Sequence, residues 1–262
     1  MDTQAPPEPT GQVPPQEDIV PGPPIRLLFR DVIADCLSDR RPPQAAMLLD
    51  SEVAPFWGNR SFLADFYNDI LHQDTCQPTT ADGIVLLAAL AVDDRVPARH
   101  RFEAMQLLFN AATVTDRHLA ESWPATPLHA DLDSEARTRS AVQACTPDLL
   151  ARWSAECPAN RLALAGLAVL FPTGRTLPAL TPRLRGFTRQ HPPGTDVGDY
   201  VRFILVLASQ DANQTLAATE EFTDAYWTGT PRAAPTRARA LHLLGEMLAR
   251  VKTGLIRSNG GQ

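Results

Sequence analysis

The sequence predicts an all-α protein built from stacked helical hairpins. In three places a proline is followed within four residues by an arginine and then by alanine and leucine at helical spacing; these segments start at Pro97, Pro158 and Pro235. Proline fits the first position of a helix, because its missing N–H would have no partner there. No segment shows the sustained apolar and polar alternation of a strand. We therefore expect a degenerate helical repeat of roughly ten to twelve helices and almost no sheet.

The first expected helices are amphipathic or apolar. Residues 25–37 and 59–72 carry apolar side chains at three- and four-residue spacings, which are typical of an amphipathic helix. Residues 84–92 are rich in alanine and leucine and lead through the charged turn Asp93–Arg95 into the Pro97 segment. We expect this apolar run and the Pro97 segment to form a helical hairpin.

The middle and the end of the chain are expected to continue in the same way. Residues 134–144 form one predicted helix, and residues 146–157 form another in which Thr146 caps the helix and Pro147 takes its first position. The later predicted helices cover 158–171, 177–190, 197–209 after a Thr195–Asp196 cap, 213–223, and the segment that starts at Pro235.

Three parts of the chain differ in composition. Residues 1–24 contain eight prolines and no basic residue, so we expect a disordered, Pro-rich leader that buries too little apolar surface to fold. Residues 25–256 form the expected helical domain. Residues 257–262 are rich in glycine and are expected to be a frayed tail.

The paired segments with an arginine near the start of the second helix resemble HEAT-type repeats, as in 158–171 and 201–211. The resemblance covers about Thr79 to Arg250 and implies an irregular right-handed α-solenoid of helical hairpins. The three proline–arginine segments start 61 and then 77 residues apart, whereas a HEAT unit takes about 40 to 47 residues. One unit per segment is therefore excluded, and some units must lack the proline–arginine start.

Composition limits the location and the class of partner. The chain has 23 arginines against one lysine, together with 24 prolines, a bias typical of a high-GC bacterial genome such as an actinobacterial one. Its net charge of −6 argues against general nucleic-acid binding, which needs a concentrated positive surface. Its four cysteines are widely spaced, and no apolar run reaches the roughly 20 residues that cross a bilayer. We expect a reduced, cytoplasmic protein without a membrane span.

One segment contains several potential metal ligands, namely His129, Asp131 and Asp133. In an extended loop these side chains would share a side, and oxygen ligands with one imidazole suit a divalent cation. The alternative is that Asp133 or Ser134 caps the following helix, where acidic residues are favoured by the helix dipole. We favour the cap, and predict neither a metal nor a cofactor.

The candidate binding residues are arginines with a common place in the repeat and one tryptophan. Arginines near the start of second helices would line one ridge of the array, available to an acidic partner or an anionic ligand; ion pairs with nearby acids such as Asp94 or Asp199 explain them equally well. Trp57 and Trp227 are expected to close the ends of the helix stack, or to anchor a partner. The candidate set is Arg99, Arg101, Arg161, Arg202, Arg237, Arg239 and Trp227.

These patterns favour a non-catalytic scaffold or regulator that presents a concave groove to another protein or peptide, because stacked repeats create extended surfaces. One alternative is an enzyme on a HEAT-like scaffold, either a DNA glycosylase-like protein or a small-molecule tailoring enzyme. The glycosylase alternative requires a positive groove that holds Trp123, Trp153 or Trp227 beside an aspartate. A third candidate is an immunity or antitoxin-like protein that blocks a basic target.

Overall fold

The computed structural model describes residues 70–259 except 73, 95, 97 and 228–231, and, of these, side chains as far as Val251 except those of His72 and Arg99. Several predictions concern residues outside the described part. These are the expected leader at 1–24, the expected helix at 25–37, most of the expected helix at 59–72, Trp57 and residues 260–262. Within that part the chain forms nine helices and one two-stranded sheet of two residues per strand, so the all-α prediction is confirmed.

The helices follow one another with short connections. A hairpin of β1 (Leu71–His72) and β2 (Thr75–Cys76) precedes them, with Leu71 paired to Cys76 and His72 to Thr75. The helices are α4 (Thr80–Val92), α5 (Ala98–Ala112), α6 (Val114–Ser122), α7 (Leu132–Ala151), α8 (Pro158–Leu170), α9 (Thr176–Gln190), α10 (Asp196–Ser209), α11 (Ala212–Tyr226) and α12 (Thr236–Asn259).

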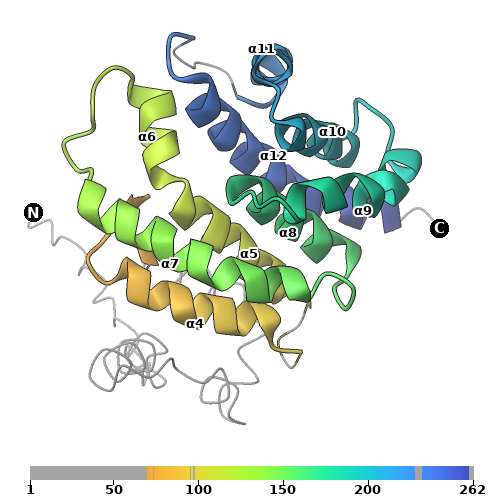
Figure 1. The fold of residues 1–262 in the computed structure, drawn as a ribbon, viewed down its shortest axis with the longest axis horizontal. Coiled ribbons are helices and arrows are strands. Elements are labelled where there is room, and N and C mark those ends of the chain that lie inside the picture. Colours follow the sequence, from red (N-terminus) through yellow and green to blue (C-terminus); the bar gives the residue numbers. More distant parts are fainter. Residues whose placement is uncertain (1–69, 73, 95, 97, 228–231, 260–262) are drawn as a thin grey trace, which may run out of the picture.

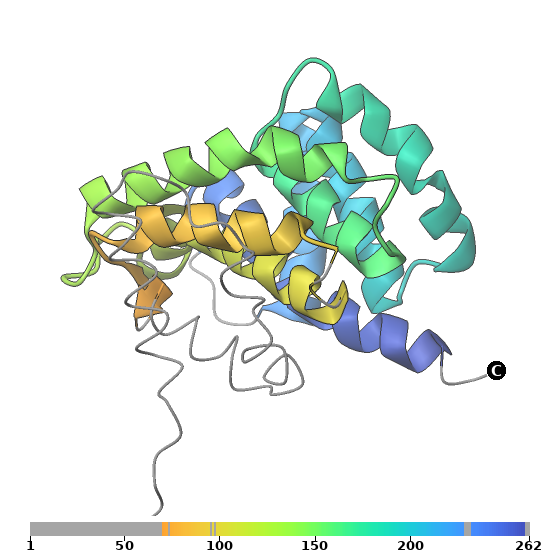
Figure 2. The same cartoon turned by 90° about the horizontal axis from the view of Figure 1, so that it is seen from below.

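The helices form two groups joined by α12 (Figures 1 and 2). Helices α4, α5 and α7 pack together in one group, and α8 to α11 form the other, with α8 against α5. The last helix, α12, packs against α6 and α5 of the first group and against α8, α10 and α11 of the second. A linear repeat array has contacts between neighbouring units only. The α12 contacts go beyond that pattern, and a right-handed solenoid stays a prediction.

Several predicted helix starts are confirmed. Helix α8 begins at Pro158 in its first turn, and α4 and α5 form the expected hairpin. Helix α10 begins after Thr195, whose Oγ1 accepts a hydrogen bond from the Gly198 amide at 3.1 Å. A Cβ atom at Gly198 would collide with the Pro192 carbonyl oxygen, so this tight start requires glycine.

The expected break before Pro147 is wrong, because α7 is one continuous helix from Leu132 to Ala151. Thr146 does not cap a new helix; its Oγ1 donates to the Val142 carbonyl at 2.8 Å. Pro147 removes one bond to the carbonyl of Gln143, and both residues are exposed, so water can reach that carbonyl. Burial of Val142, Thr146 and Leu149 on one face favours continuing the helix.

Two other boundaries and one helix differ from the prediction. The helix expected over 59–72 does not include Leu71 and His72, which form β1, and the left-handed Asp74 (φ 63°) turns the chain into the short hairpin. Helix α6 was not predicted, since its sequence has few apolar residues and only Val114, His118 and Ala120 are buried. Helix α12 continues to Asn259, past the expected domain end at 256.

The core lies where α5, α8, α10 and α12 meet. Phe109, Leu164, Phe203 and Met247 are fully buried there. Tyr200 is also fully buried, and its hydroxyl donates to the Leu162 carbonyl at 3.1 Å. None of the helices that the structure describes is both long and apolar enough to cross a membrane.

Candidate functional site

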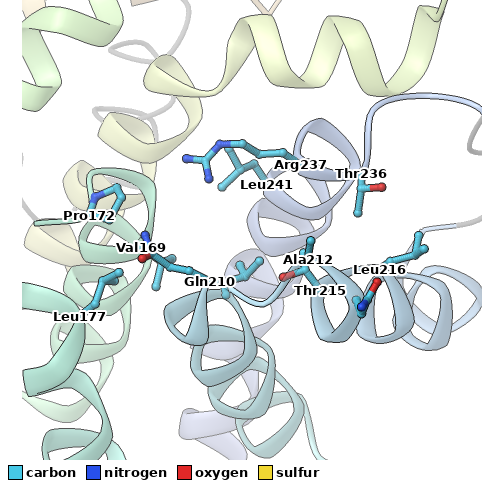
Figure 3. Close-up of a pocket in the computed structure, with 12 residues that line it drawn as sticks. Val169, Pro172, Leu177, Gln210, Ala212, Thr215, Leu216, Thr236, Arg237 and Leu241 are labelled. Carbon is cyan, nitrogen blue, oxygen red and sulfur yellow. The ribbon is translucent and has the colours of Figure 1, made fainter. Parts of the chain in front are cut away.

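The candidate site is a pocket of about 460 Å³ between the ends of five helices, which we call pocket A (Figure 3). It lies where α8 ends, α9 begins, α10 ends and α11 and α12 begin. Its apolar wall consists of Val169, Pro172, Leu177, Leu207, Ala212, Leu216 and Leu241. Its polar groups are Gln210, Asn213, Thr215, Thr236 and Arg237.

A sharp reversal between α10 and α11 shapes the floor of pocket A. Gln210 ends α10 in the left-handed conformation, with φ 57° and ψ 20°. Asp211 then caps α11, and its Oδ1 accepts hydrogen bonds from the amides of Asn213 at 2.9 Å and Gln214 at 3.0 Å. This tight connection turns the first turn of α11 into the pocket wall.

A second pocket of about 420 Å³, which we call pocket B, adjoins pocket A. Pro172, Leu177 and Gln210 line both pockets. Pocket B is more polar than pocket A, since Thr173, Thr181 and Ser209 are among its lining residues. Side by side, the two pockets offer an apolar site and a polar site around the end of α10.

Among the described residues that line pocket A, Arg237 is the one with a charge, and its side chain is exposed. Figure 3 shows this side chain above Leu241, with the guanidinium directed toward the side formed by Pro172. Several other arginines form ion pairs with described residues, but Arg237 takes part in none of these pairs. The Arg237 charge interacts with Asp116. Burial raises the pKa of Asp116, whereas the charges of Arg139 and, more weakly, Arg237 lower it.

Two other candidate arginines are buried in ion pairs. Arg101 donates to the Glu156 carboxylate at 2.9 Å and to the Val96 carbonyl at 2.6 Å. Arg239, only 1% exposed, donates to Glu220 at 2.6 Å. In the described structure its Nε and Nη2 atoms have no hydrogen-bond partner. These two side chains therefore contribute to packing between helices.

The remaining candidate arginines contact their own neighbourhood. Arg161 donates to the carbonyls of Trp153 at 3.0 Å and Ser154 at 3.2 Å. Arg202 pairs with Glu221 on the surface and lies 4.9 Å from the centre of the Phe222 ring. Arg99 lies in α5, and its side chain is outside the described part.

The acids named as alternative partners bind other groups. Asp94 pairs with Arg152, and this bond holds the pKa of Asp94 below its usual value. Asp199 accepts hydrogen bonds from the Gly194 amide at 2.8 Å and from the Tyr226 hydroxyl at 3.1 Å. The five candidate arginines whose side chains are described therefore do not form one ridge of free guanidinium groups. Of these five, Arg237 lines pocket A and takes part in no ion pair between described residues.

Trp227 closes the end of α11. It follows the last residue of that helix, packs against the core, and lies edge-on to the His242 ring at a centroid distance of 4.1 Å. Burial lowers the pKa of His242 to about 4, and the nearby Arg117 charge acts in the same direction. The Glu121 carboxylate, 3.5 Å from the imidazole, is half-exposed and does not outweigh these effects.

The segment with His129, Asp131 and Asp133 is a helix start. Asp131, rather than Asp133 or Ser134, caps α7: its carboxylate accepts from the Ser134 amide at 3.1 Å and from the Ser134 hydroxyl at 2.7 Å. These bonds lower the pKa of Asp131. Among the described residues, no three His, Cys, Asp or Glu side chains are arranged to hold a metal ion.

A buried polar cluster joins α6 and α7 and was not predicted. Nδ1 of His118 lies 3.2 Å from Oε1 of Glu135, and Thr115 donates to Oε2 at 2.6 Å. Burial raises the pKa of Glu135, but His118 and Thr115 lower it further than burial raises it. Cys76 lies nearby, and burial raises its pKa to about 11, so it remains a thiol. This closed cluster lines neither pocket.

The sequence could not have identified most of the pocket. Arg237 was in the candidate set, but Gln210, Leu216 and Leu241 were not, because each is an ordinary residue of an amphipathic helix or its end. One local signal was present in the sequence. The residue directly before the Asp211 cap is Gln210, where a helix end commonly has glycine, so α10 ends on a non-glycine residue. Comparisons of the chain with protein-family models, curated proteins and solved structures found no match.

Proposed function

We propose that the protein is a non-catalytic binding protein whose pockets A and B hold an extended segment of a partner protein. The observation that carries this proposal is the chemistry of pocket A: an apolar wall, four neutral polar residues and one guanidinium. Side chains of this kind fix the orientation of a ligand. General acid–base or nucleophilic catalysis needs a carboxylate, imidazole, thiol or activated hydroxyl at the site.

The arrangement of the pockets favours an extended occupant. Pockets A and B, of about 460 and 420 Å³, share three lining residues. A peptide in an extended conformation advances about 3.3 Å per residue and points successive side chains to opposite sides, so it can offer side chains to two adjoining pockets. The apolar pocket would receive an apolar side chain, and the more polar pocket B would receive a polar one.

The enzyme alternatives gain no support from the site. The glycosylase alternative requires an aromatic side chain and an aspartate in the groove, but the described residues that line pockets A and B include neither. Trp153 is buried under Arg183, Trp227 packs on His242, and Trp123 ends α6. An immunity or antitoxin-like role is one biological form of the binding function that we propose.

The helix starts and the composition of the chain also support a type of fold, a source and a compartment. The proline–arginine starts support a HEAT-type array, although α12 crosses both groups of helices. The excess of arginine over lysine supports a high-GC bacterial source. Cys76, Cys145 and Cys157 are free thiols, which supports a reducing compartment such as the cytoplasm.

A pull-down with a blocked pocket tests the function. Ala212 is exposed, lies at the first position of α11 and lines pocket A, so Ala212→Trp fills the pocket without disturbing the core. The control is Ala217→Trp, since Ala217 is exposed on the same helix and lines neither pocket. We expect a stoichiometric partner to be retained by the wild type and by Ala217→Trp but lost with Ala212→Trp. Equal retention by all three proteins would contradict the proposal.

A further inference from the structure

We infer that the partner segment carries an acidic side chain within two residues of an apolar side chain, with the carboxylate on Arg237 and the apolar group in pocket A. The inference rests on the proposed function and adds the chemistry of the occupant. It is carried by three features: a guanidinium that belongs to none of the ion pairs between described residues, an open apolar wall, and a residue held in a strained conformation between the two pockets.

Arg237 has no evident role in stabilising its own helix. It is the second residue of α12, where the helix dipole disfavours a positive charge. It lies four residues from Leu241, so its aliphatic part can rest on the apolar wall, and Figure 3 shows the guanidinium directed toward the side formed by Pro172. The same dipole that disfavours the arginine favours an anion, so a bound carboxylate would gain from both charges.

The apolar part of the site is open to a partner. Leu216 is 43% exposed at the rim of pocket A, although it is a large apolar residue. Leu177, Leu207 and Leu241 line the same pocket from three other helices. An apolar side chain of the partner would remove this surface from water, which is the main source of affinity in such a site.

Gln210 offers the group that recognises a peptide backbone. Helices commonly end in this left-handed conformation with glycine or asparagine, because a larger side chain is strained there. Gln210 adopts it with φ 57° and lines both pockets. Its carboxamide can donate one hydrogen bond and accept another, which matches the N–H and C=O of an extended peptide. Strain of this kind is common at ligand sites.

A single guanidinium favours a carboxylate over a polyanion. Binding to a nucleic-acid backbone requires several cations along one surface, and pocket A has one in a chain of net charge −6. Arginine and a carboxylate form two parallel charge-assisted hydrogen bonds. An aspartate or glutamate side chain next to an apolar residue therefore fits the site in charge and in shape.

The test uses a phage library of random dodecapeptides selected on the full-length protein. We expect the selected peptides to contain Asp or Glu within two residues of Leu, Ile, Val, Phe or Met. A labelled consensus peptide should bind Arg237→Glu about tenfold to a hundredfold more weakly than the wild type, since a charged hydrogen-bonded pair is lost. Replacing the acidic residue of the peptide by lysine should restore binding to Arg237→Glu.

A control variant separates charge at the site from charge elsewhere, and a second site variant tests Gln210. Arg185→Glu makes the same charge change at an exposed position of α9 that lines neither pocket, and should leave the affinity unchanged. Gln210→Gly should weaken the peptide severalfold while the protein remains folded, as measured by circular dichroism. Equal binding of the peptide by Arg237→Glu and the wild type would overturn the inference.

The outcomes distinguish the inference from the proposed function. If the selected peptides lose binding with Ala212→Trp but lack an acidic residue, pocket A binds peptides and only the inference is wrong. If no selected peptide distinguishes the wild type from Ala212→Trp, both are wrong. If octanoate displaces the peptide at equal concentration, the site takes a small carboxylic acid, which overturns the inference of a peptide.

Discussion

The starts of α5 and α12 have the same sequence pattern but different surroundings. Each has arginines two and four residues after a proline: Arg99 and Arg101 after Pro97, and Arg237 and Arg239 after Pro235. In both helices the arginine at the fourth position is buried and pairs with a glutamate, Glu156 for Arg101 and Glu220 for Arg239. The second position of α12 turns outward instead, because two residues correspond to about 200° around a helix.

The two buried pairs differ in the exposure of the acid. The Glu156 side chain is fully buried and is also contacted by Asn160 at 2.6 Å and Arg152 at 3.3 Å. The Glu220 side chain is 39% exposed. A carboxylate that water can reach remains solvated when its arginine is removed. A buried carboxylate is left without solvation and without its partner, which costs stability. The same arginine pattern should therefore contribute very differently to stability in the two places.

The largest effect is expected from Arg101→Met. The substitution leaves the Glu156 carboxylate buried, with Asn160 and Arg152 as its remaining partners among the described residues, so we expect the free energy of unfolding to fall by about 3 kcal/mol. Equilibrium unfolding in urea measures this change. A loss below about 1 kcal/mol would mean that Arg152 alone compensates Glu156.

Acid should weaken the packing of α12 through His242. Its pKa is about 4 in the folded protein and about 6.5 when unfolded, so the unfolded state binds the proton first as the pH falls. The stability is complete above pH 6.5 and is lost progressively down to pH 4. Between pH 7.5 and 5 this amounts to about 2 kcal/mol. Urea unfolding of the wild type and of His242→Gln should show this extra pH dependence in the wild type alone.

Gln210→Gly should stabilise the protein. Glycine adopts the left-handed conformation without steric strain, and we expect a gain of about 1 kcal/mol, offset in part by the greater freedom of glycine in the unfolded chain. The thermal midpoint measures the gain. A decrease would show that the Gln210 side chain makes a stabilising contact, and would argue against its role in recognition.

The smallest effects are expected from the arginines of α12. Arg239→Met leaves an exposed Glu220 and removes two buried nitrogen atoms that lack partners in the described structure, so we expect a change below about 1 kcal/mol. Arg237→Ala should change stability by less than about 0.5 kcal/mol, because its side chain is exposed. If Arg239→Met is as harmful as Arg101→Met, burial of the acid does not explain the difference between the two pairs.

Much of the helical structure could be predicted because its causes are local. The start of α8 follows from Pro158, and the start of α10 follows from the Thr195 cap. Predictions failed where packing outweighs local preference. Pro147 suggested a break that α7 does not have, and α6 has too few apolar residues to be recognised without its contact to α12.

The candidate site could be predicted only in part. Arg237 belongs to a repeated pattern, so the sequence indicated it. The other residues of pocket A come from five helices and their connections, and their side chains have no distinctive spacing. One of the two alternatives for the arginines placed their partners in the adjacent turn, yet Glu156, the partner of Arg101, is 55 residues away. Such contacts depend on how helices are placed, which no local pattern encodes.

By itself the sequence determined that this chain is helical, where several helices begin, and that arginines four residues after a proline recur. These features depend on backbone hydrogen bonds and caps within a few residues of each other. Only the tertiary structure decided which glutamate each buried arginine meets, that α12 joins both groups of helices, and that Arg237 borders an apolar pocket. Contacts between distant segments are set by the packing of whole helices, and a pocket is the space which that packing leaves.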